Sequence, residues 1–439
     1  MQLTDIAFIF YFLPLFLAVY YITSEKQKHL TIIVGSLVFF LLQDGIGLWQ
    51  VSVLIALIVF TFLLGTEVCK RKGLLPFALL VLAAVLIFFK CWRGGTLLIP
   101  GMSFYLFQMA AYLWDVKRKR LEPERNLAAY SAQVLFFPKL LSGPLVEPAQ
   151  LQSQMHRPKI TQIRFRAGLQ EVVLGLSLKV LLADRLAALW NQAAVIGYDS
   201  ISTPLAWVAL VSFAMRLYFD FHGYSLMAVG LGKMLGFQLP GNFNDPYAAR
   251  SVSDFYNRWH MTLYRWFREY IYIPLGGSWK GRFRTVLNIL IVWTVTGLWH
   301  GIGGNYLIWA LYLAFWIIQE KLWLRKLLEK AGVFAHLYTL FLILLSWVPF
   351  AIGDWGQMLT FLSRLFGIGE SVSIDFMQTV SSYLPVLILG VLLVTPFPAA
   401  FFEVVRDSIL CDCVLFVLFW LCIYFISTAG QDPFLYFSF

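Results

Sequence analysis

Residues 74–89 read LLPFALLVLAAVLIFF, an uncharged apolar run that Lys90 follows directly. A helix needs about 20 predominantly apolar residues to cross the hydrocarbon core of a bilayer, and this run is typical of such a helix. Working outward along the chain, we find further runs at 6–22, 30–43, 49–67, 95–114, 168–189, 203–221, 285–300, 305–320, 335–352, 382–400 and 409–428. They predict an all-α polytopic membrane protein with about ten to twelve transmembrane helices.

Composition and charge support the same class of protein. Of 439 residues, 60% are hydrophobic and 13% are charged, and the mean hydropathy is +0.73; soluble domains carry about 25% charged residues. The net charge of +10 is explained by Lys and Arg in cytoplasmic loops, so we expect no nucleic-acid partner. The five cysteines form no Cys-x-x-Cys pair, and we expect neither a disulfide framework nor a metal centre.

The distribution of basic residues predicts the orientation of the helices. Lys26 and Lys28 follow the first apolar run and no base precedes it, so this run is a span with an external N-terminus and not a signal peptide. Basic segments recur at 70–72 and 117–120. Continuing the count places 280–284 and 321–330 inside and the C-terminus outside.

The middle of the chain departs from the regular pattern. Residues 134–145 are apolar but contain Pro138, Gly143 and Pro144, which favours a re-entrant hairpin over a span. The chain therefore divides into N-terminal transmembrane helices (1–125), a core with re-entrant and amphipathic segments (126–330) and C-terminal transmembrane helices (331–439).

The segment DFYNRWHMTLYRWFREYIYI (254–273) combines charges and aromatic rings. Ionisable groups at membrane depth cost a few kcal/mol each, so these must face protein, water or one another. Helical spacing puts Trp259 and Trp266 on one face and Arg258 and Arg265 on another, which predicts one continuous amphipathic helix at the cytoplasmic interface. An interfacial anchor and a functional site remain alternative interpretations.

The segment TVTGLWHGIGGNY (294–306) ends an apolar run at His300 among glycines. A buried, neutral imidazole can accept a proton from a hydroxyl, and the glycines would let a thioester or a sugar approach the ring. A structural histidine is the alternative, but His260 is a second histidine in an intramembrane context and favours chemistry. We place His222 in a glycine-containing bend, and Lys280 and Arg282 beside a glycine turn that suits phosphate groups.

Several strings together resemble the membrane-bound O-acyltransferase family, in its alginate O-acetyltransferase branch. The strings that match are SFYLFQMAAYLWDV (103–116), FFPKLLSGPLVEP (136–148), YFDFHGYSLMAVGLGKMLGF (218–237), the segment around RWH (242–277), LWHG (298–301) and PFLYFSF (433–439). His222 and Leu226 depart from the serine and aspartate that alginate-type members commonly have. This departure keeps D-alanyl transfer to teichoic acid as an alternative.

The resemblance implies a membrane-embedded core with a central tunnel and an enzymatic function. It implies that His300 is catalytic and that His260 is the second histidine. We expect substrate contacts from Asn257, Arg258, Trp259, Trp299, Lys280 and Arg282. An acetyl group would pass from cytoplasmic acetyl-CoA, a substrate and not a bound cofactor, to an extracytoplasmic polysaccharide such as an alginate-like exopolysaccharide, cellulose or peptidoglycan. We expect a plasma-membrane protein with an SGNH-type or esterase-like partner. A transporter with a histidine proton relay is the non-enzymatic alternative.

Overall fold

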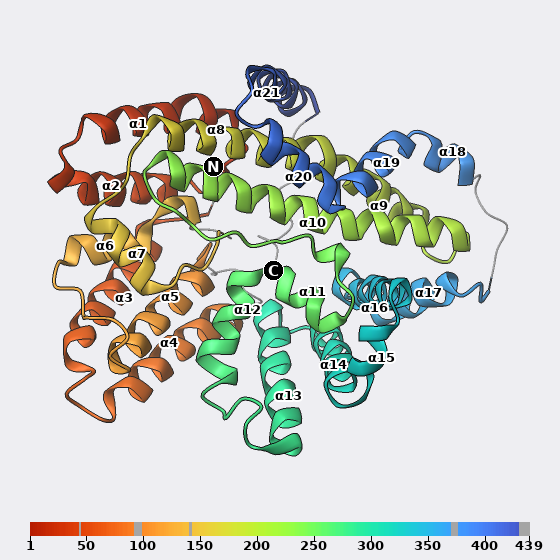
Figure 1. Ribbon diagram of the computed structural model, residues 1–439, viewed down its shortest axis with the longest axis horizontal. Helices are drawn as coiled ribbons and strands as arrows, with labels where there is room; N and C mark the ends of the chain where they lie inside the picture. The colour runs from red at the N-terminus through yellow and green to blue at the C-terminus, as the bar shows by residue number, and fades with distance from the viewer. Residues whose placement is uncertain (44, 92–98, 140–142, 370–375, 430–439) are drawn as a thin grey trace. The chain divides into compact units, whose positions relative to one another are not determined.

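The computed structural model describes residues 1–439 except 44, 92–98, 140–142, 370–375 and 430–439 (Figure 1). The described residues form helices and turns without any strand, so the all-α class is confirmed. Their contacts divide the chain into two units: residues 1–176, 223–241 and 418–430 form the first, and residues 177–222 and 242–417 form the described part of the second.

The first unit holds most of the N-terminal helices. They are α1 (Leu13–Ile22, after a π-helical turn at Phe8–Phe12), α2 (Lys28–Leu41), α3 (Leu48–Glu67), α4 (Leu74–Cys91), α5 (Met102–Lys117), α6 (Leu127–Leu135), α7 (Pro148–His156) and α8 (Gln162–Ser177). α4 packs against α5, and α6 packs against α2, α3 and α7. Part of the expected re-entrant hairpin, 140–142, lies outside the described residues, as does PFLYFSF.

The second unit holds the elements that carry both histidines of interest. They are α9 (Asp184–Ile196), α11 (Val252–Arg258), α12 (Met261–Phe267), α13 (Gly281–His300), α14 (Gly304–Gln319), α15 (Arg325–Lys330), α16 (Val333–Ala351), α17 (Trp355–Leu365), α18 (Phe376–Ser381), α19 (Leu384–Leu393) and α20 (Pro396–Val405). α14 packs against both α13 and α16, and α11 also contacts α14 and α16 (Figure 1). α10 (Thr203–Met234) and α21 (Ile409–Ala429) contribute to both units.

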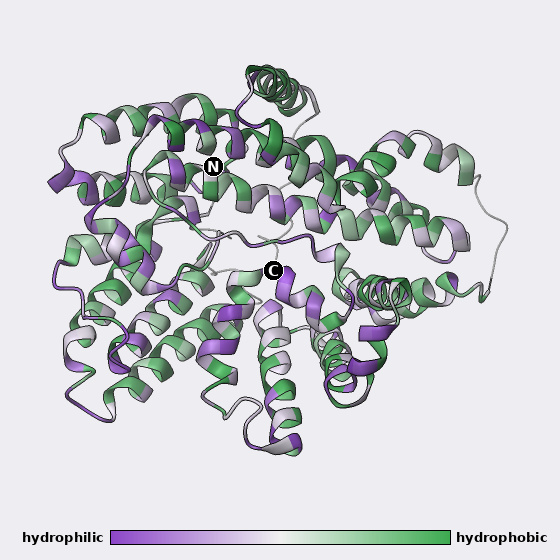
Figure 2. Ribbon diagram, in the orientation of Figure 1, coloured by the Kyte–Doolittle hydropathy of each residue, from purple (hydrophilic) through white to green (hydrophobic). Residues whose placement is uncertain are grey.

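Six helices of the described residues are long and apolar enough to cross a membrane. They are α3, α4, α10, α16, α21 and the helix that runs from Gly304 to Lys330. In Figure 2 the ribbon of α21 is almost entirely green, the colour of hydrophobic residues. The number is smaller than the ten to twelve predicted, because several apolar runs fold as shorter helices: α2 has 14 residues and α5 has 16.

Two of the predicted spans differ from the helices in the structure. The run at 382–400 is not one helix, since α19 and α20 meet at an angle of 73°. Pro396 begins α20, and proline fits the first turn of a helix but disrupts an interior. The predicted span 203–221 instead continues as α10 to Met234, so the bend expected at His222 is wrong.

Glycines allow two helices of the first unit to approach closely. A side chain at Gly175 of α8 would collide with the carbonyl oxygen of Gly223 in α10, and one at Gly168 would collide with that of Gly230. Small residues at such crossings bring helix backbones into contact, as in many membrane proteins. A side chain at Gly230, within YFDFHGYSLMAVGLGKMLGF (218–237), would in turn collide with the carbonyl oxygen of Gly168, so this glycine of the string serves packing.

Candidate active site

His260 lies at a break between α11 and α12. Its backbone is left-handed, with φ 46° and ψ 50°, a conformation uncommon for a residue other than glycine and often found at functional sites. Two backbone hydrogen bonds hold the break: Asn244 N–H donates to Arg258 O (3.0 Å) and Met261 N–H donates to Asn242 O (2.9 Å). The prediction of one continuous amphipathic helix over 254–273 is therefore wrong, because the helix is interrupted at His260.

The His260 side chain is buried, with 4% of its surface exposed. Its Nδ1 lies 3.3 Å from Oδ1 of Asn242, and the ring meets Phe221 edge to face with a centroid distance of 4.6 Å. Burial lowers the pKa of His260 to about 3, because desolvation disfavours the charged imidazolium. The ring is therefore neutral at physiological pH.

His300 is the last residue of α13 and is also buried, as predicted, with 7% of its surface exposed. Aromatic rings from three helices surround it. Trp299 precedes it in α13, Trp309 of α14 lies 4.9 Å away between ring centroids, and Phe350 of α16 lies 5.2 Å away. The packing of α13, α14 and α16 fixes the position of this imidazole.

The glycines around His300 serve a different purpose from the predicted one. A side chain at Gly297 would meet the Cβ of Ala310 at 2.8 Å and the carbonyl oxygen of Tyr306 at 2.9 Å, and one at Gly304 would meet Trp355 at 2.9 Å. Neighbouring helices thus already occupy the space beside these two glycines. Gly297 allows α13 and α14 to pack closely, Gly304 leaves room for Trp355 of α17, and neither opens a path to the ring.

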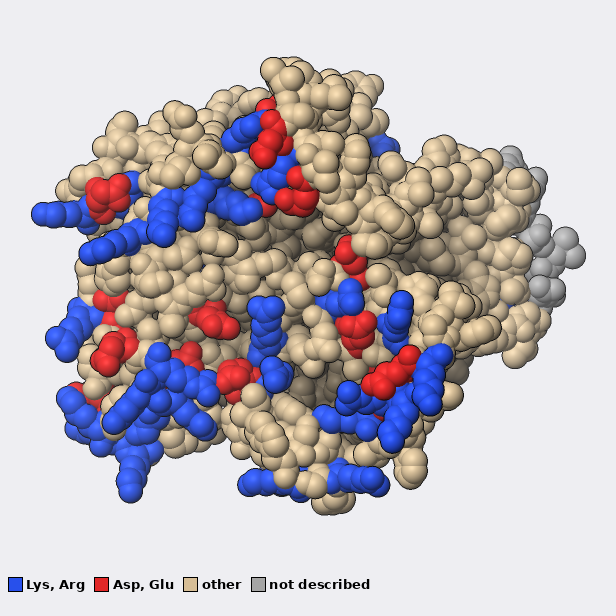
Figure 3. Space-filling model, in the orientation of Figure 1, with Lys and Arg blue, Asp and Glu red and all other residues tan. Residues whose placement is uncertain are grey.

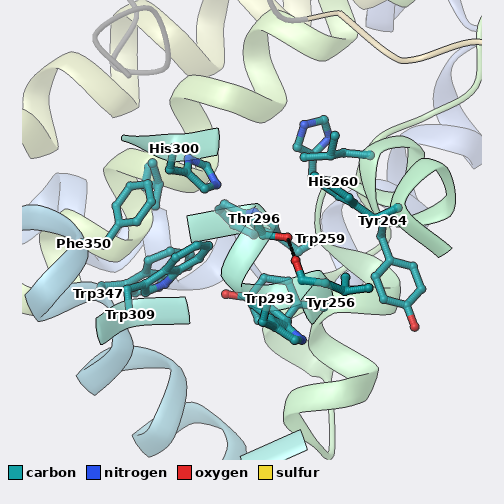
Figure 4. Close-up of a pocket in the computed structure, with 14 residues that line it drawn as sticks. Tyr256, Trp259, His260, Tyr264, Trp293, Thr296, His300, Trp309, Trp347 and Phe350 are labelled. Carbon is teal, nitrogen blue, oxygen red and sulfur yellow. Dashed lines mark hydrogen bonds between the residues drawn. The ribbon is translucent and has the colours of Figure 1, made fainter. Parts of the chain in front are cut away.

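Both histidines line one small cavity of about 80 Å³, which we call the inner cavity (Figure 4). A single water needs about 10–15 Å³ measured in this way, so the inner cavity has room for a small chemical group. Its lining is Leu217, Tyr256, Trp259, His260, Leu263, Tyr264, Phe267, Val292, Trp293, Thr296, His300, Trp309, Trp347 and Phe350. Figure 4 shows His260 and His300 on opposite sides of it. Among these described lining residues there is no carboxylate, lysine or arginine.

A second cavity of about 880 Å³, the outer cavity, adjoins the inner one, since Tyr256, Tyr264, Phe267, Val292 and Trp293 line both. Its other lining residues include several of opposite charge: Arg250, Asp254, Arg268, Glu320, Lys321, Arg325 and Glu329. In Figure 3, basic and acidic side chains gather on the part of the surface where α15 lies. The two cavities therefore pair a charged chamber with an uncharged one.

The structure brings only some of the predicted substrate-contacting residues to these cavities. Trp259 lines the inner cavity and Asn257 lines the outer one. Trp299 lines neither and packs its ring against His300. Arg258 also lines neither, and its Nε lies 2.9 Å from Oδ1 of Asp254.

The two basic residues of the glycine turn lie apart from both cavities. Lys280 and Arg282 are exposed, and neither belongs to the lining of the inner or the outer cavity. Among the described residues, no three His, Cys, Asp or Glu side chains gather as metal ligands would. The two imidazoles of the inner cavity offer acid–base and nucleophilic chemistry.

Sequence reasoning missed several cavity residues. Trp309, Trp347 and Phe350 form much of the inner wall, and Lys321 and Arg325 line the outer cavity. The high aromatic content, 17% of the chain, is the one signal that pointed toward such a wall. Nothing in the local sequence relates Lys321 or Arg325 to His260, since helix packing brings them to the same pair of cavities.

Comparison with known proteins identifies the class of protein. Residues 117–343 match the membrane-bound O-acyltransferase family, and the chain belongs to it. It is therefore a multi-pass membrane protein and an O-acyltransferase, so the transporter alternative is wrong.

Individual relatives place the chain in the alginate O-acetylase branch of the family. A probable alginate O-acetylase of Pseudomonas putida is 32% identical over 392 residues, which cover 83% of this chain and 80% of the relative. The peptidoglycan O-acetyltransferase of Helicobacter pylori is 29% identical, covering 82% and 79%. The teichoic acid D-alanyltransferase of Bacillus subtilis is 26% identical, covering 49% and 56%.

Proposed function

We propose that this enzyme transfers acetyl groups from a cytoplasmic acyl-CoA donor, most simply acetyl-CoA, across the membrane for the O-acetylation of an extracytoplasmic polysaccharide. The observation that carries the proposal is the pairing of the two cavities, in which His260 and His300 line a small uncharged chamber beside a large charged one. Relatives named for O-acetylation of alginate and of peptidoglycan cover most of the chain. They support an acetyl donor and a cell-envelope or secreted acceptor.

The proposed reaction needs a group that moves one proton. The acceptor hydroxyl oxygen attacks the thioester carbonyl while His300 takes the hydroxyl proton; the carbon–sulfur bond then breaks and the leaving thiolate receives that proton. In the other route a nitrogen of neutral His300 attacks the thioester carbonyl, the carbon–sulfur bond breaks, and the leaving thiolate takes the N–H proton of the ring. The acceptor hydroxyl oxygen then attacks the acetylated His300, the nitrogen–carbon bond breaks, and the hydroxyl proton returns to the imidazole. In both routes His260 positions the donor or the acceptor.

The size of the inner cavity supports a short acyl group. The cavity measures about 80 Å³, and Trp293, Trp309, Trp347 and Phe350 are among its walls. Bulky rings leave an acetyl group room beside the two histidines, whereas a long acyl chain would have to displace them. Displacing close-packed rings is energetically costly, because protein interiors have little free volume.

Charge at the inner cavity favours acetyl over D-alanyl transfer. A D-alanyl group carries an ammonium, and none of the described residues that line this cavity is an aspartate or glutamate. Removing an ammonium from water costs several kcal/mol, and a cation–π contact returns about 2 kcal/mol when the site is dry. An uncharged acetyl group avoids this cost.

The outer cavity suits the phosphate-bearing part of the donor. Arg268, Lys321 and Arg325 line it, and arginine and lysine are the side chains that bind phosphate most often. Asn257 lies in the same lining, and we propose that it contacts the donor there. Lys280 and Arg282 would attract the donor at the cytoplasmic surface. Arg258, Trp259 and Trp299 would form or support the cavity walls around the bound donor.

The remaining parts of the proposal concern the surroundings of the enzyme. We propose that the protein lies in the plasma membrane with both termini outside. An SGNH-type or esterase-like protein would complete transfer to the polymer, which could be an alginate-like exopolysaccharide, cellulose or peptidoglycan. Tightly bound cofactors are not part of the mechanism, since the histidines and the thioester supply the chemistry.

A donor comparison in membranes tests the proposal. Membranes that contain the enzyme are given radiolabelled acetyl-CoA or a D-alanyl thioester, and label in acid-insoluble polymer is counted against membranes that lack it. Mass analysis of envelope and secreted polysaccharide from cells with and without the gene identifies the acceptor. Acetyl transfer supports the proposal, and label from the D-alanyl donor alone would contradict it.

A further inference from the structure

Asn242 makes a set of contacts with the His260 turn that the proposed reaction does not use. The residue is 1% exposed. Its backbone oxygen accepts from Met261 N–H at 2.9 Å. Its side-chain Oδ1 accepts from Thr262 Oγ1–H at 2.6 Å and lies 3.3 Å from Nδ1 of His260. One buried asparagine therefore contacts three successive residues, 260 to 262, at the break between α11 and α12: His260 and Thr262 through its side chain and Met261 through its backbone.

The orientation of this amide follows from its donors. The backbone N–H of Thr262 also points at Oδ1, at 3.4 Å, and a backbone N–H can only donate. The atom that faces it must be the amide oxygen, because the NH₂ group has no lone pair to offer. Rotating the amide by half a turn would set two donors against each other in a buried place.

The tautomer of His260 follows from that orientation. An amide oxygen only accepts, so Nδ1 of His260 must carry the hydrogen, and in a neutral imidazole Nε2 then holds the lone pair. We propose that Asn242 is a positioning residue that fixes His260 as the Nδ1–H tautomer, so that Nε2 accepts a hydrogen bond from an acceptor hydroxyl next to the one that attacks. This inference rests on the proposed acyl transfer and decides between the two roles left open for His260.

The choice between donor and acceptor comes from the chemistry of the two substrates. A thioester offers a carbonyl oxygen and a sulfur, both of which need a hydrogen-bond donor. A sugar hydroxyl has a hydrogen to donate. A neutral His260 with its lone pair at Nε2 has nothing to give the thioester. It can accept from a neighbouring hydroxyl of the sugar and so direct the attacking oxygen, whose proton His300 takes, toward the carbonyl carbon. His260 thus serves the acceptor, and His300 keeps the role of base or acyl carrier.

The surroundings of His260 favour the neutral ring. Tyr256 of α11, Tyr264 of α12 and His300 of α13 are the titratable side chains that line the inner cavity with it, and Phe221 of α10 covers its edge. None of these described groups is an anion at neutral pH. An anion placed beside Nδ1 would stabilise the imidazolium, and this offers a way to test the assignment.

Nitrogen NMR on the resting enzyme with isotopically labelled histidine tests the tautomer directly. The His260 signals are assigned by their loss in His260→Gln. We expect Nδ1 protonated and Nε2 unprotonated in the wild type, and a mixture of tautomers in Asn242→Leu. A wild-type ring protonated at Nε2, or an Asn242→Leu spectrum identical to that of the wild type, would overturn the inference.

Kinetics distinguish positioning from a structural role. Asn242→Leu should lower kcat about 10- to 100-fold, a part of what a positioned acid–base group contributes, and should leave the Kd for acetyl-CoA unchanged. Asn242→Asp keeps the acceptor oxygen but adds a negative charge. The added charge should raise the pKa of His260 by about 1–3. The transfer rate should then begin to fall at a higher pH than in the wild type as the solution is acidified, because the ring becomes protonated and inactive.

A matched control separates these effects from loss of a buried amide. Asn288 is fully buried, and its amide donates to Gly277 O at 2.9 Å, apart from both histidines. Asn288→Leu should lower stability and leave the pH profile and the histidine spectrum unchanged. If Asn242→Leu weakens acetyl-CoA binding instead of acceptor transfer, His260 serves the donor and the inference is wrong.

The two measurements also separate this inference from the proposed function. The NMR spectrum needs neither donor nor acceptor, so it reports the tautomer even if wild-type membranes transfer no acetyl group. A spectrum with Nδ1 protonated and no transfer from acetyl-CoA would contradict the proposed function, and with it the assigned partner of Nε2. Transfer from acetyl-CoA with Nε2 protonated would contradict the inference alone.

Discussion

Glu320 holds the helix that leads to His260, so its replacement should damage both stability and catalysis. Its carboxylate is 4% exposed and accepts from Val252 N–H at 2.6 Å, from Ser253 N–H at 2.9 Å and from Ser253 Oγ–H at 2.7 Å. These donors form the first turn of α11. The anchor therefore lies at one end of a seven-residue helix, and the His260 turn lies at the other.

The expected magnitude follows from the donors left without an acceptor. A buried donor that loses its partner costs about 1–3 kcal/mol. Glu320→Ala leaves all three donors without their acceptor, although water can reach the Ser253 hydroxyl. We therefore expect a loss of about 2–5 kcal/mol in the free energy of unfolding. Glu320→Gln keeps one acceptor oxygen and should lose about 1–3 kcal/mol.

Thermal unfolding in detergent and acyl-transfer rates check this prediction together. The control is Glu67→Gln, because Glu67 pairs with Lys70 at 2.7 Å while both side chains are exposed, and exposed pairs contribute little to stability. Glu67 lines neither cavity. Glu320→Ala should melt well below the control and lose acyl transfer. A Glu320→Ala protein with the melting temperature and rate of Glu67→Gln would refute the anchoring role.

Three further substitutions have defined outcomes. Gly297→Ala puts a methyl group 2.8 Å from the Cβ of Ala310. The substitution should lower the free energy of unfolding by about 1–3 kcal/mol and therefore lower the melting temperature. An unchanged melting temperature would contradict the close packing of α13 and α14. Lys179→Met removes the cation that lies 2.8 Å from Oδ1 of buried Asp220 and should cost about 3–5 kcal/mol; equal denaturation curves would contradict this. Trp309→Ala enlarges the inner cavity and should raise the rate with butyryl-CoA relative to acetyl-CoA about tenfold or more; an unchanged ratio would show that Trp309 does not limit acyl length.

The apolar runs predicted the helices well because hydrophobic length depends on local sequence alone. α3 (Leu48–Glu67) lies within a residue of its predicted bounds. The turns between helices depend on tertiary contacts instead. The break at His260 needs Asn242, which lies 18 residues earlier and pairs with the turn only in the folded chain.

The candidate site was predicted in part for the same reason. His260 and His300 could be singled out because ionisable residues in apolar surroundings are costly, and the structure places both in one cavity. The packing role of Gly297 could not be predicted from the residues next to it in the sequence. The side chain that lies against it, Ala310, belongs to the next helix. Sequence periodicity identifies faces of helices and does not identify what covers them.

The central claim is that His300 performs the proton or acyl transfer in the inner cavity. It is tested most directly by the initial rate of label transfer from radiolabelled acetyl-CoA by His300→Ala in membranes. The control is His336→Ala, since His336 lines neither cavity and its Nδ1 lies 3.1 Å from Ala249 O. We predict a loss of about 10²–10⁴-fold for His300→Ala and a rate near that of the wild type for His336→Ala. A His300→Ala enzyme that transfers acetyl groups at the wild-type rate would contradict the account.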